Sequence, residues 1–245
     1  MPAQPDSTLN KLIERLSGYA KDHTKLSEFT VRHLKNEANI LMKVNPAEGA
    51  MIKGMIACLE GDLEECEKQH EISIKLNHDL IFVQNYASSL SRLGKNKYAY
   101  QLIKQVLKDN KNSAEVIYIC IQIAFYAGCY SDISNYQDML KRLKINDIPD
   151  ETVRYISYAN VMTNMNFPDN VFPQISSILE SIRLDHHVET KQSYLFSIED
   201  GIFHWEETTA DVDTTVTMNI ELAEELAIRE DLKLDGYTIA FRAHQ

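Results

Sequence analysis

The 245-residue chain contains little glycine or proline, and it has no long apolar run. Its 8 glycines and 6 prolines are too few for long linkers and favour helix. The longest apolar-rich stretch, residues 116–128, is interrupted by Gln122 and is too short to cross a bilayer. We therefore expect a mostly helical protein with no membrane segment and no membrane partner.

Positive charge is also scarce, and the formal net charge is −11. Binding to a phosphate backbone needs a basic face, so nucleic acid is not expected as the main ligand. The charge is uneven, because residues 186–245 carry 4 basic and 13 acidic side chains. This shift predicts a separate acidic unit at 186–245, whose surface suits a basic partner.

The four cysteines form no CxxC motif, and Cys58 and Cys66 are eight residues apart, which is not the spacing of a zinc pair. We interpret all four, Cys120 and Cys129 included, as small buried residues in a reducing compartment. The first residues also lack the apolar core of a signal peptide. The expected location is therefore cytoplasmic.

Motifs of common catalytic and cofactor sites are missing as well. The sequence has no phosphate-binding glycine loop, nucleophile elbow, HExxH or acidic calcium loop. The most metal-like pair is His186 and His187, beside Arg183 and Asp185, but adjacent histidines rarely point the same way. We expect no catalytic residue, no cofactor and no metal. A small enzyme with a site at the domain junction around His186 and His187 is kept as an alternative.

What the sequence does contain is a repeat. Gly61, Gly94 and Gly128 recur at intervals of 33 and 34 residues, inside stretches that resemble one another. A period of about 34 residues is typical of helix–turn–helix repeats. With each glycine at the turn between two helices, the repeats cover 47–79, 80–113 and 114–147.

This alignment assigns one position per helix to the place where paired helices cross and small side chains are needed. The residues there are Gly54, Ala87 and Ile121 in the first helices, and Cys66, Ala99 and Ile133 in the second. Together with the stretches 61–66 and 85–94, this pattern resembles about three degenerate tetratricopeptide (TPR) repeats in 47–147. The third repeat departs from the family at its two isoleucines, and the usual closing proline is absent.

The resemblance implies an α-solenoid over 1–185. Helical spacing predicts further helices at 7–21, 25–43, 150–164 and 169–183, which would cap the repeats. In the family, the first helices of successive repeats line a concave groove that binds a peptide. Carried over by position, the partner-binding residues are Met51, Met55, Gln84, Asn85, Ser88, Arg92, Tyr118, Gln122 and Phe125. Gln84, Arg92 and Tyr118 should be exposed, and Leu90 and Leu93 buried.

In the acidic unit the apolar period changes to two. Alternation over 193–199 and 202–206, around Asp200-Gly201, predicts a β-hairpin that pairs Ile198 with Phe203 and Phe196 with Trp205. Trp205 is expected in the hairpin core. A third strand at 212–218, a helix at 220–230 capped by Asn219, and a last strand at 237–243 complete a β-β-β-α-β order.

The expected fold is mostly α: a TPR-like helical-hairpin solenoid followed by a small acidic α+β unit. The expected function is a non-enzymatic protein-interaction module, or scaffold, that binds a partner polypeptide through its concave face. The alternative is an immunity protein or antitoxin-type inhibitor whose acidic unit covers a basic partner such as a nuclease. That alternative depends on the cluster Asp211, Asp213, Glu221, Glu224, Glu225, Glu230 and Asp231.

Overall fold

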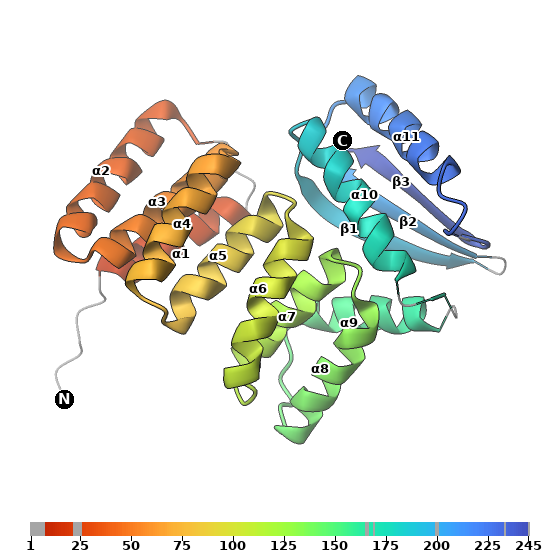
Figure 1. The fold of residues 1–245 in the computed structure, drawn as a ribbon, viewed down its shortest axis with the longest axis horizontal. Coiled ribbons are helices and arrows are strands. Elements are labelled where there is room, and N and C mark those ends of the chain that lie inside the picture. The colour runs from red at the N-terminus through yellow and green to blue at the C-terminus, as the bar shows by residue number, and fades with distance from the viewer. Residues whose placement is uncertain are drawn as a thin grey trace. The chain divides into compact units, whose positions relative to one another are not determined.

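The computed structural model describes residues 8–21, 26–164, 167–168, 170–198, 201–232 and 234–244 (Figure 1). In this part of the chain, ten helices precede a three-stranded sheet, and the fold is mostly α as expected. Contacts divide the chain into two compact units, Met1–Leu93 and Gly94–Gln245. The domain boundary expected at 185/186 stays a prediction.

The first unit consists of helices that pack in sequence. α2 packs against α3, α3 against α4 and α4 against α5, while α1 packs on α3. The bounds are α1 Thr8–Lys21, α2 Glu28–Val44, α3 Pro46–Glu60, α4 Leu63–Leu76 and α5 Leu80–Arg92. The helices predicted at 7–21 and 25–43 are therefore confirmed.

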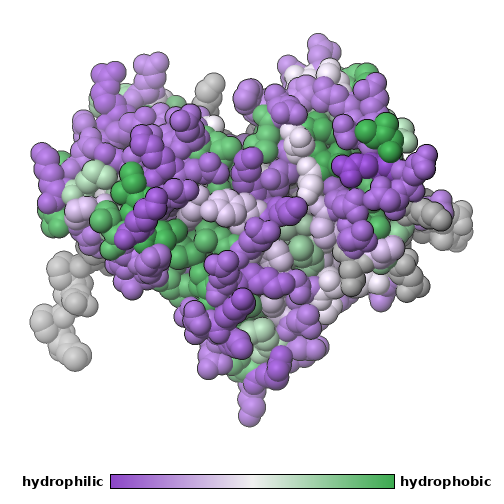
Figure 2. Space-filling model, viewed as in Figure 1, coloured by the Kyte–Doolittle hydropathy of each residue, from purple (hydrophilic) through white to green (hydrophobic). Residues whose placement is uncertain are grey.

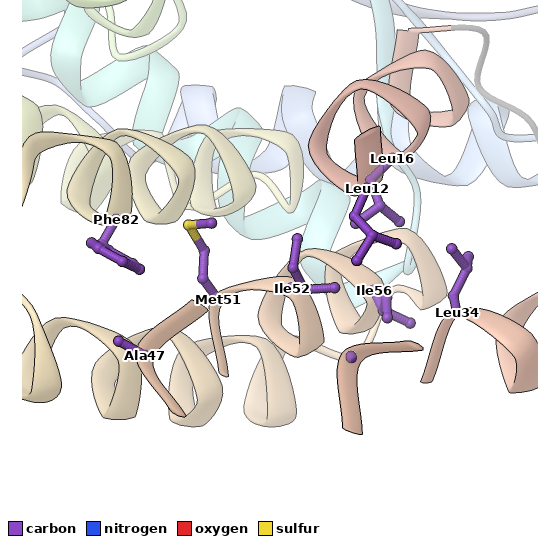
Figure 3. Packing of buried hydrophobic residues seen from close by; sticks show 9 residues of the cluster. Leu12, Leu16, Leu34, Ala47, Met51, Ile52, Ile56 and Phe82 are labelled. Atoms are coloured by element: carbon purple, nitrogen blue, oxygen red, sulfur yellow. The ribbon is translucent and has the colours of Figure 1, made fainter. Parts of the chain in front are cut away.

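The core of this unit forms where α1 and α2 meet α3. Leu12 and Leu16 of α1 lie next to Ile52 and Ile56 of α3, and all four are almost fully buried (Figure 3). Leu34 of α2 and Phe82 of α5 belong to the same cluster. Each helix therefore buries an apolar stripe against α3, as amphipathic helices require.

The described residues of the second unit form six more helices and the sheet. α6 packs on α7, α7 on α8 and α8 on α9, and α10 lies against α6 and α11. The bounds are α6 Asn96–Asp109, α7 Ala114–Tyr126, α8 Tyr130–Arg142, α9 Asp150–Thr163, α10 Val171–Asp185, β1 Thr190–Ile198, β2 Gly201–Thr208, α11 Val212–Ala227 and β3 Tyr237–Ala243. The helices predicted at 150–164 and 169–183 and the last strand are confirmed.

The three repeat glycines do what the pattern predicts. Gly61, Gly94 and Gly128 stand at the ends of α3, α5 and α7 with φ of 76°, 85° and 71°. The amides that follow Gly61 and Gly128 donate to carbonyls five residues earlier, at 3.0 and 2.8 Å. This is the hydrogen-bond pattern of a glycine-terminated helix, which needs a left-handed residue. The predicted crossing residues Cys66, Ala99, Ile121 and Ile133 are fully buried.

The sheet has the order β1-β2-β3, with β1 and β2 antiparallel and β2 and β3 parallel. The expected third strand at 212–218 is wrong, because these residues begin α11. Asp211 is its N-cap and accepts a hydrogen bond from the Thr214 amide at 2.8 Å. Asn219 is therefore not a cap but lies inside the helix. The observed order is β-β-α-β.

The predicted hairpin exists, but its register is shifted by two residues. Phe196 pairs with Phe203 and Ile198 with Gly201, whereas the sequence predicted Phe203 as the partner of Ile198. Glu199 and Asp200 lie outside the described residues. The reason is that Gly201 belongs to β2: the Ile202 amide donates to the Gly236 carbonyl at 2.7 Å, and a Cβ on Gly201 would lie 2.5 Å from that oxygen.

The expected core of the hairpin is also wrong, although a shift of two residues leaves each side chain on the same face. Along β2 the buried residues are Ile202, His204, Glu206 and Thr208, so the covered face of the sheet is largely polar. Trp205 is half-buried on the opposite face, with the Phe196 ring 5.4 Å away and the Arg242 guanidinium 5.4 Å from its centroid. The apolar alternation of this hairpin therefore marks its more open face. No helix in the described ranges is long and apolar enough to cross a membrane.

Gly54 of α3 leaves room for the side chain of His70 of α4. His70 is fully buried, stacks on Tyr86 at 5.1 Å, and its Nε2 lies 3.0 Å from the Ser89 hydroxyl. A Cβ on Gly54 would lie 2.5 Å from the imidazole ring. Three helices, α3, α4 and α5, are therefore fitted around one imidazole.

The Gly54→Ala substitution should destabilise the protein by roughly 1–3 kcal/mol, because the added methyl group overpacks against the imidazole of His70. Gly18→Ala is the matched control, since Gly18 also lies in a helix but has open space around its Cβ position. That change should stabilise by about 0.5–1 kcal/mol. Urea unfolding of both variants measures the difference, and equal effects would contradict the assigned crossing.

His70 should also make stability depend on pH. Burial lowers the pKa of His70 from 6.5 to about 3. Between these values the unfolded chain binds a proton that the folded chain does not. The contribution of neutral His70 to the free energy of unfolding is therefore fully present above about pH 6.5. It is lost as the pH falls toward 3, by about 2 kcal/mol at pH 5. Unfolding free energies at pH 7 and pH 5 should differ less in His70→Gln, and an unchanged difference would show that His70 is not responsible.

Candidate functional site

The residues assigned to the groove in the first unit are not equally accessible. Met51 is fully buried in the core of α1 and α3, and Gln84 is 9% exposed, so neither presents a surface for a partner. Met55 and Asn85 are half-buried, and Ser88 is exposed. The expected exposure of Gln84 is therefore wrong, because this side chain lies on the buried face of α5.

Arg92 closes this line of residues at the end of α5. It is half-buried, and its guanidinium donates to the Ala20 carbonyl of α1 at 2.6 Å. The sequence predicted an exposed side chain, but the last turn of α1 covers one side of the guanidinium. Leu90 is fully buried as expected, while Leu93 is only half-buried.

In the second unit the predicted residues again differ in exposure. Gln122 is exposed, and Tyr118 is half-buried with its hydroxyl donating to the Asp147 carbonyl at 3.2 Å. Phe125 is 3% exposed, with its ring centroid 4.9 Å from that of Tyr155. Phe125 is therefore a core residue. That the remaining residues of both units share one groove stays a prediction.

The covered face of the sheet contains a buried ion pair that the sequence analysis did not find. Arg183 of α10 and Glu206 of β2 have side chains 5% and 8% exposed, with Arg183 Nε 3.4 Å from Glu206 Oε2. The guanidinium also donates to the hydroxyl of Thr190, which in turn donates to Glu206 at 3.2 Å. The only sign of it in the sequence was that two polar residues, His204 and Glu206, alternate with aromatic residues along β2.

His204 lies next to this ion pair. Its Nδ1 is 2.6 Å from the Tyr237 hydroxyl, and its buried Nε2 has no hydrogen-bond partner among the described residues. Burial lowers the pKa of His204 and raises that of Tyr237 well above 10, so both side chains are neutral near pH 7.

A small cavity borders His204, Glu206, Ser193 and Tyr237 under α10. Its volume is about 10 Å³, which is close to the space of one water molecule and far below that of an organic substrate. The arrangement can therefore position a water molecule and hold the sheet against α10. Its geometry suits a structural role better than substrate chemistry.

The predicted histidine pair lies at the end of α10, where His186 contacts α11. His186 Nε2 lies 2.8 Å from Glu221 of α11, and His187 has a left-handed backbone with φ of 54°. Arg183 points into the sheet core toward Glu206. Within the described ranges, no group of three or more histidine, cysteine, aspartate or glutamate side chains is placed to bind a metal ion.

The acidic cluster falls mainly on α11. Asp211, Asp213, Glu224, Glu225, Glu230 and Asp231 are exposed, and Glu221 is half-buried beside His186. The helix itself carries four acidic residues and no basic one. Val212, Val216 and Ile220 on the same helix are 68%, 55% and 55% exposed. α11 thus presents both charge and apolar surface to solvent.

Comparisons with known proteins return no matching family model, no matching curated protein and no matching solved structure. The structure defines the class of fold as a series of packed antiparallel helix pairs followed by a mixed three-stranded sheet. Any closer assignment depends on the residues of this chain.

Arg183→Met should destabilise the second unit by about 3–5 kcal/mol, because it leaves the carboxylate of Glu206 buried and unpaired. The double variant Arg183→Met, Glu206→Leu should recover much of this loss. Lys141→Met is the control, since it removes the exposed Lys141–Asp138 pair and should cost less than about 1 kcal/mol. Thermal and urea unfolding measure these values, and a double variant no more stable than Arg183→Met would contradict the pairing.

Proposed function

We propose that the protein is a non-enzymatic interaction module that binds a partner polypeptide along the first helices of TPR-like repeats. The observation that supports this most is the recurrence of one helix-ending geometry. Gly61, Gly94 and Gly128 each end a first helix in the left-handed conformation, one repeat length apart. A repeated unit with the same reversal is how solenoid proteins build an extended binding surface.

The accessible residues on these helices suit recognition of a peptide. Ser88 and Gln122 are exposed, and Met55, Asn85 and Tyr118 are half-buried. Amide and hydroxyl groups exchange hydrogen bonds with a peptide backbone, and a methionine adapts its shape to different side chains. We take these five residues, with Arg92, as the binding line. Among the described residues, Cys58, Cys66 and Cys120 are buried and form no disulfide, which fits the reducing cytoplasm that we propose as the location of the protein.

An inhibitor of the immunity-protein or antitoxin type is the second candidate. It is favoured by the exposed carboxylates of α11, where Asp213, Glu224 and Glu225 have no basic neighbour on the same helix. Such a surface attracts a basic protein and accelerates association at low salt.

The test of the first candidate is a partner isolated by affinity capture from the native host and then titrated as a pure protein. The double variant Ser88→Arg, Gln122→Arg should weaken its binding at least tenfold, because two bulky cations enter the proposed line. The matched control is Gln101→Arg, Ser131→Arg, which makes the same replacements at exposed positions of α6 and α8, the second helices of their repeats. Equal binding by both double variants would reject the binding line.

The same titration at several salt concentrations separates the second candidate. If the acidic unit is the docking face, changing Glu224, Glu225 and Asp231 to lysine lowers the association rate and flattens its salt dependence. The Ser88→Arg, Gln122→Arg variant would then bind as the wild type does.

A further inference from the structure

α11 carries two separate apolar faces. The first contains Met218 and Leu222, which are almost fully buried against the rest of the second unit. The second faces solvent and forms what we call the α11 stripe, made of Val212, Val216, Ile220, Ala223 and Ala227. All five residues are exposed. In Figure 2, apolar atoms interrupt the hydrophilic surface over α11.

The stripe is too regular to be a chance exposure of single apolar residues. At 100° per residue its five members fall within a sector of about 80° and extend along nearly the whole helix of 16 residues, about 24 Å. No polar residue of α11 occupies that sector. Isolated exposed apolar side chains are ordinary, but a continuous line with the helical period is typical of a face that packs against another element.

One side of the stripe is acidic. Asp213 and Glu224 fall in the sector immediately beside it, and among the described residues neither forms an ion pair. Glu225 lies further around the helix, and Glu221 is engaged by His186. A partner that covers the stripe brings its own flank against these carboxylates, so charge complementarity favours lysine or arginine there.

On its other side the stripe borders β3, and the contacts there favour a helical partner over an extended one. The Asn219 side chain donates to the Phe241 carbonyl and accepts from the Phe241 amide, both at 2.9 Å. This pair of hydrogen bonds occupies the outer edge of β3 at the point where an added strand would pair. A strand is therefore disfavoured beside α11, whereas a helix packs on the stripe without needing that edge.

We propose that the α11 stripe is the docking surface for a basic amphipathic helix of a partner protein. The partner helix places apolar side chains at three- and four-residue spacing on the stripe and basic side chains against Asp213 and Glu224. The proposal rests on the proposed function of protein binding and adds to it a surface and the chemistry of the partner.

The test uses a fluorescein-labelled peptide of 18 residues, composed of leucine and lysine at amphipathic helical spacing, and measures its anisotropy with the full chain. Val216→Ser, Ile220→Ser should weaken binding at least tenfold without changing the melting temperature. The control is Phe29→Ser, Ile40→Ser, which removes two apolar side chains of α2 that are more exposed still, at 82% and 65%, and should leave binding unchanged. Asp213→Lys, Glu224→Lys should weaken binding and remove most of its salt dependence.

Three outcomes would overturn the proposal. The first is equal affinity of the wild type and Val216→Ser, Ile220→Ser for the peptide. The second is equal binding of a leucine–glutamate peptide of the same pattern. The third is a concentration-dependent dimer that Val216→Ser, Ile220→Ser abolishes, which would make a second copy of the chain the occupant. The Ser88→Arg, Gln122→Arg variant tests the proposed binding line separately, so either idea can fail without the other.

Discussion

The architecture depends on a backbone feature: at the end of each first helix of the three repeats, the chain reverses through one residue with a positive φ. Gly61, Gly94 and Gly128 supply it without the steric cost that a side chain would carry. At Gly128 a second requirement is added, because a Cβ there would clash with the Phe172 carbonyl at the start of α10. The repeat is therefore defined by its turns more strictly than by the side chains at its helix crossings.

The requirement for small residues at the helix crossings is less strict than the requirement for a positive φ at the turns. Gly54 admits the His70 imidazole, while Ile121 and Ile133 are fully buried at the equivalent places of the third repeat. Bulk at one position is accepted where the neighbouring helices leave room, since cores tolerate different residues if the total volume is matched. This explains why helix pairs form although the match to the TPR pattern is degenerate.

The small sheet is stabilised in a different way from the helix pairs. Its covered face holds Arg183, Glu206 and His204, and burying these groups costs free energy that their mutual contacts offset. Such a network fixes the position of α10 over the sheet, because each polar atom has few acceptable partners. Apolar side chains lie instead on the open face of the sheet, at Phe196 and Trp205, and on the α11 stripe. The protein thus exposes apolar surface in the unit that also carries most of its negative charge.

By itself the sequence determined the features that depend on residues a few positions apart. The helices, the left-handed glycines and the buried Cys66 and Ala99 follow from helical period and turn chemistry. It also predicted the hairpin, but Gly201 was assigned to the turn, whereas the close approach of Gly236 makes it part of β2.

Only the tertiary structure decided the rest. The alternating, β-branched residues 212–218 favour a strand locally, yet they form a helix, because a parallel β2–β3 pair needs a crossover connection and α11 provides it. Likewise, Met51, Gln84 and Phe125 were assigned to a binding surface by position in a repeat, and they are buried because α1 and the neighbouring helices cover them. Burial depends on which helices meet and on how they are rotated, and the position of a residue within its repeat does not determine this.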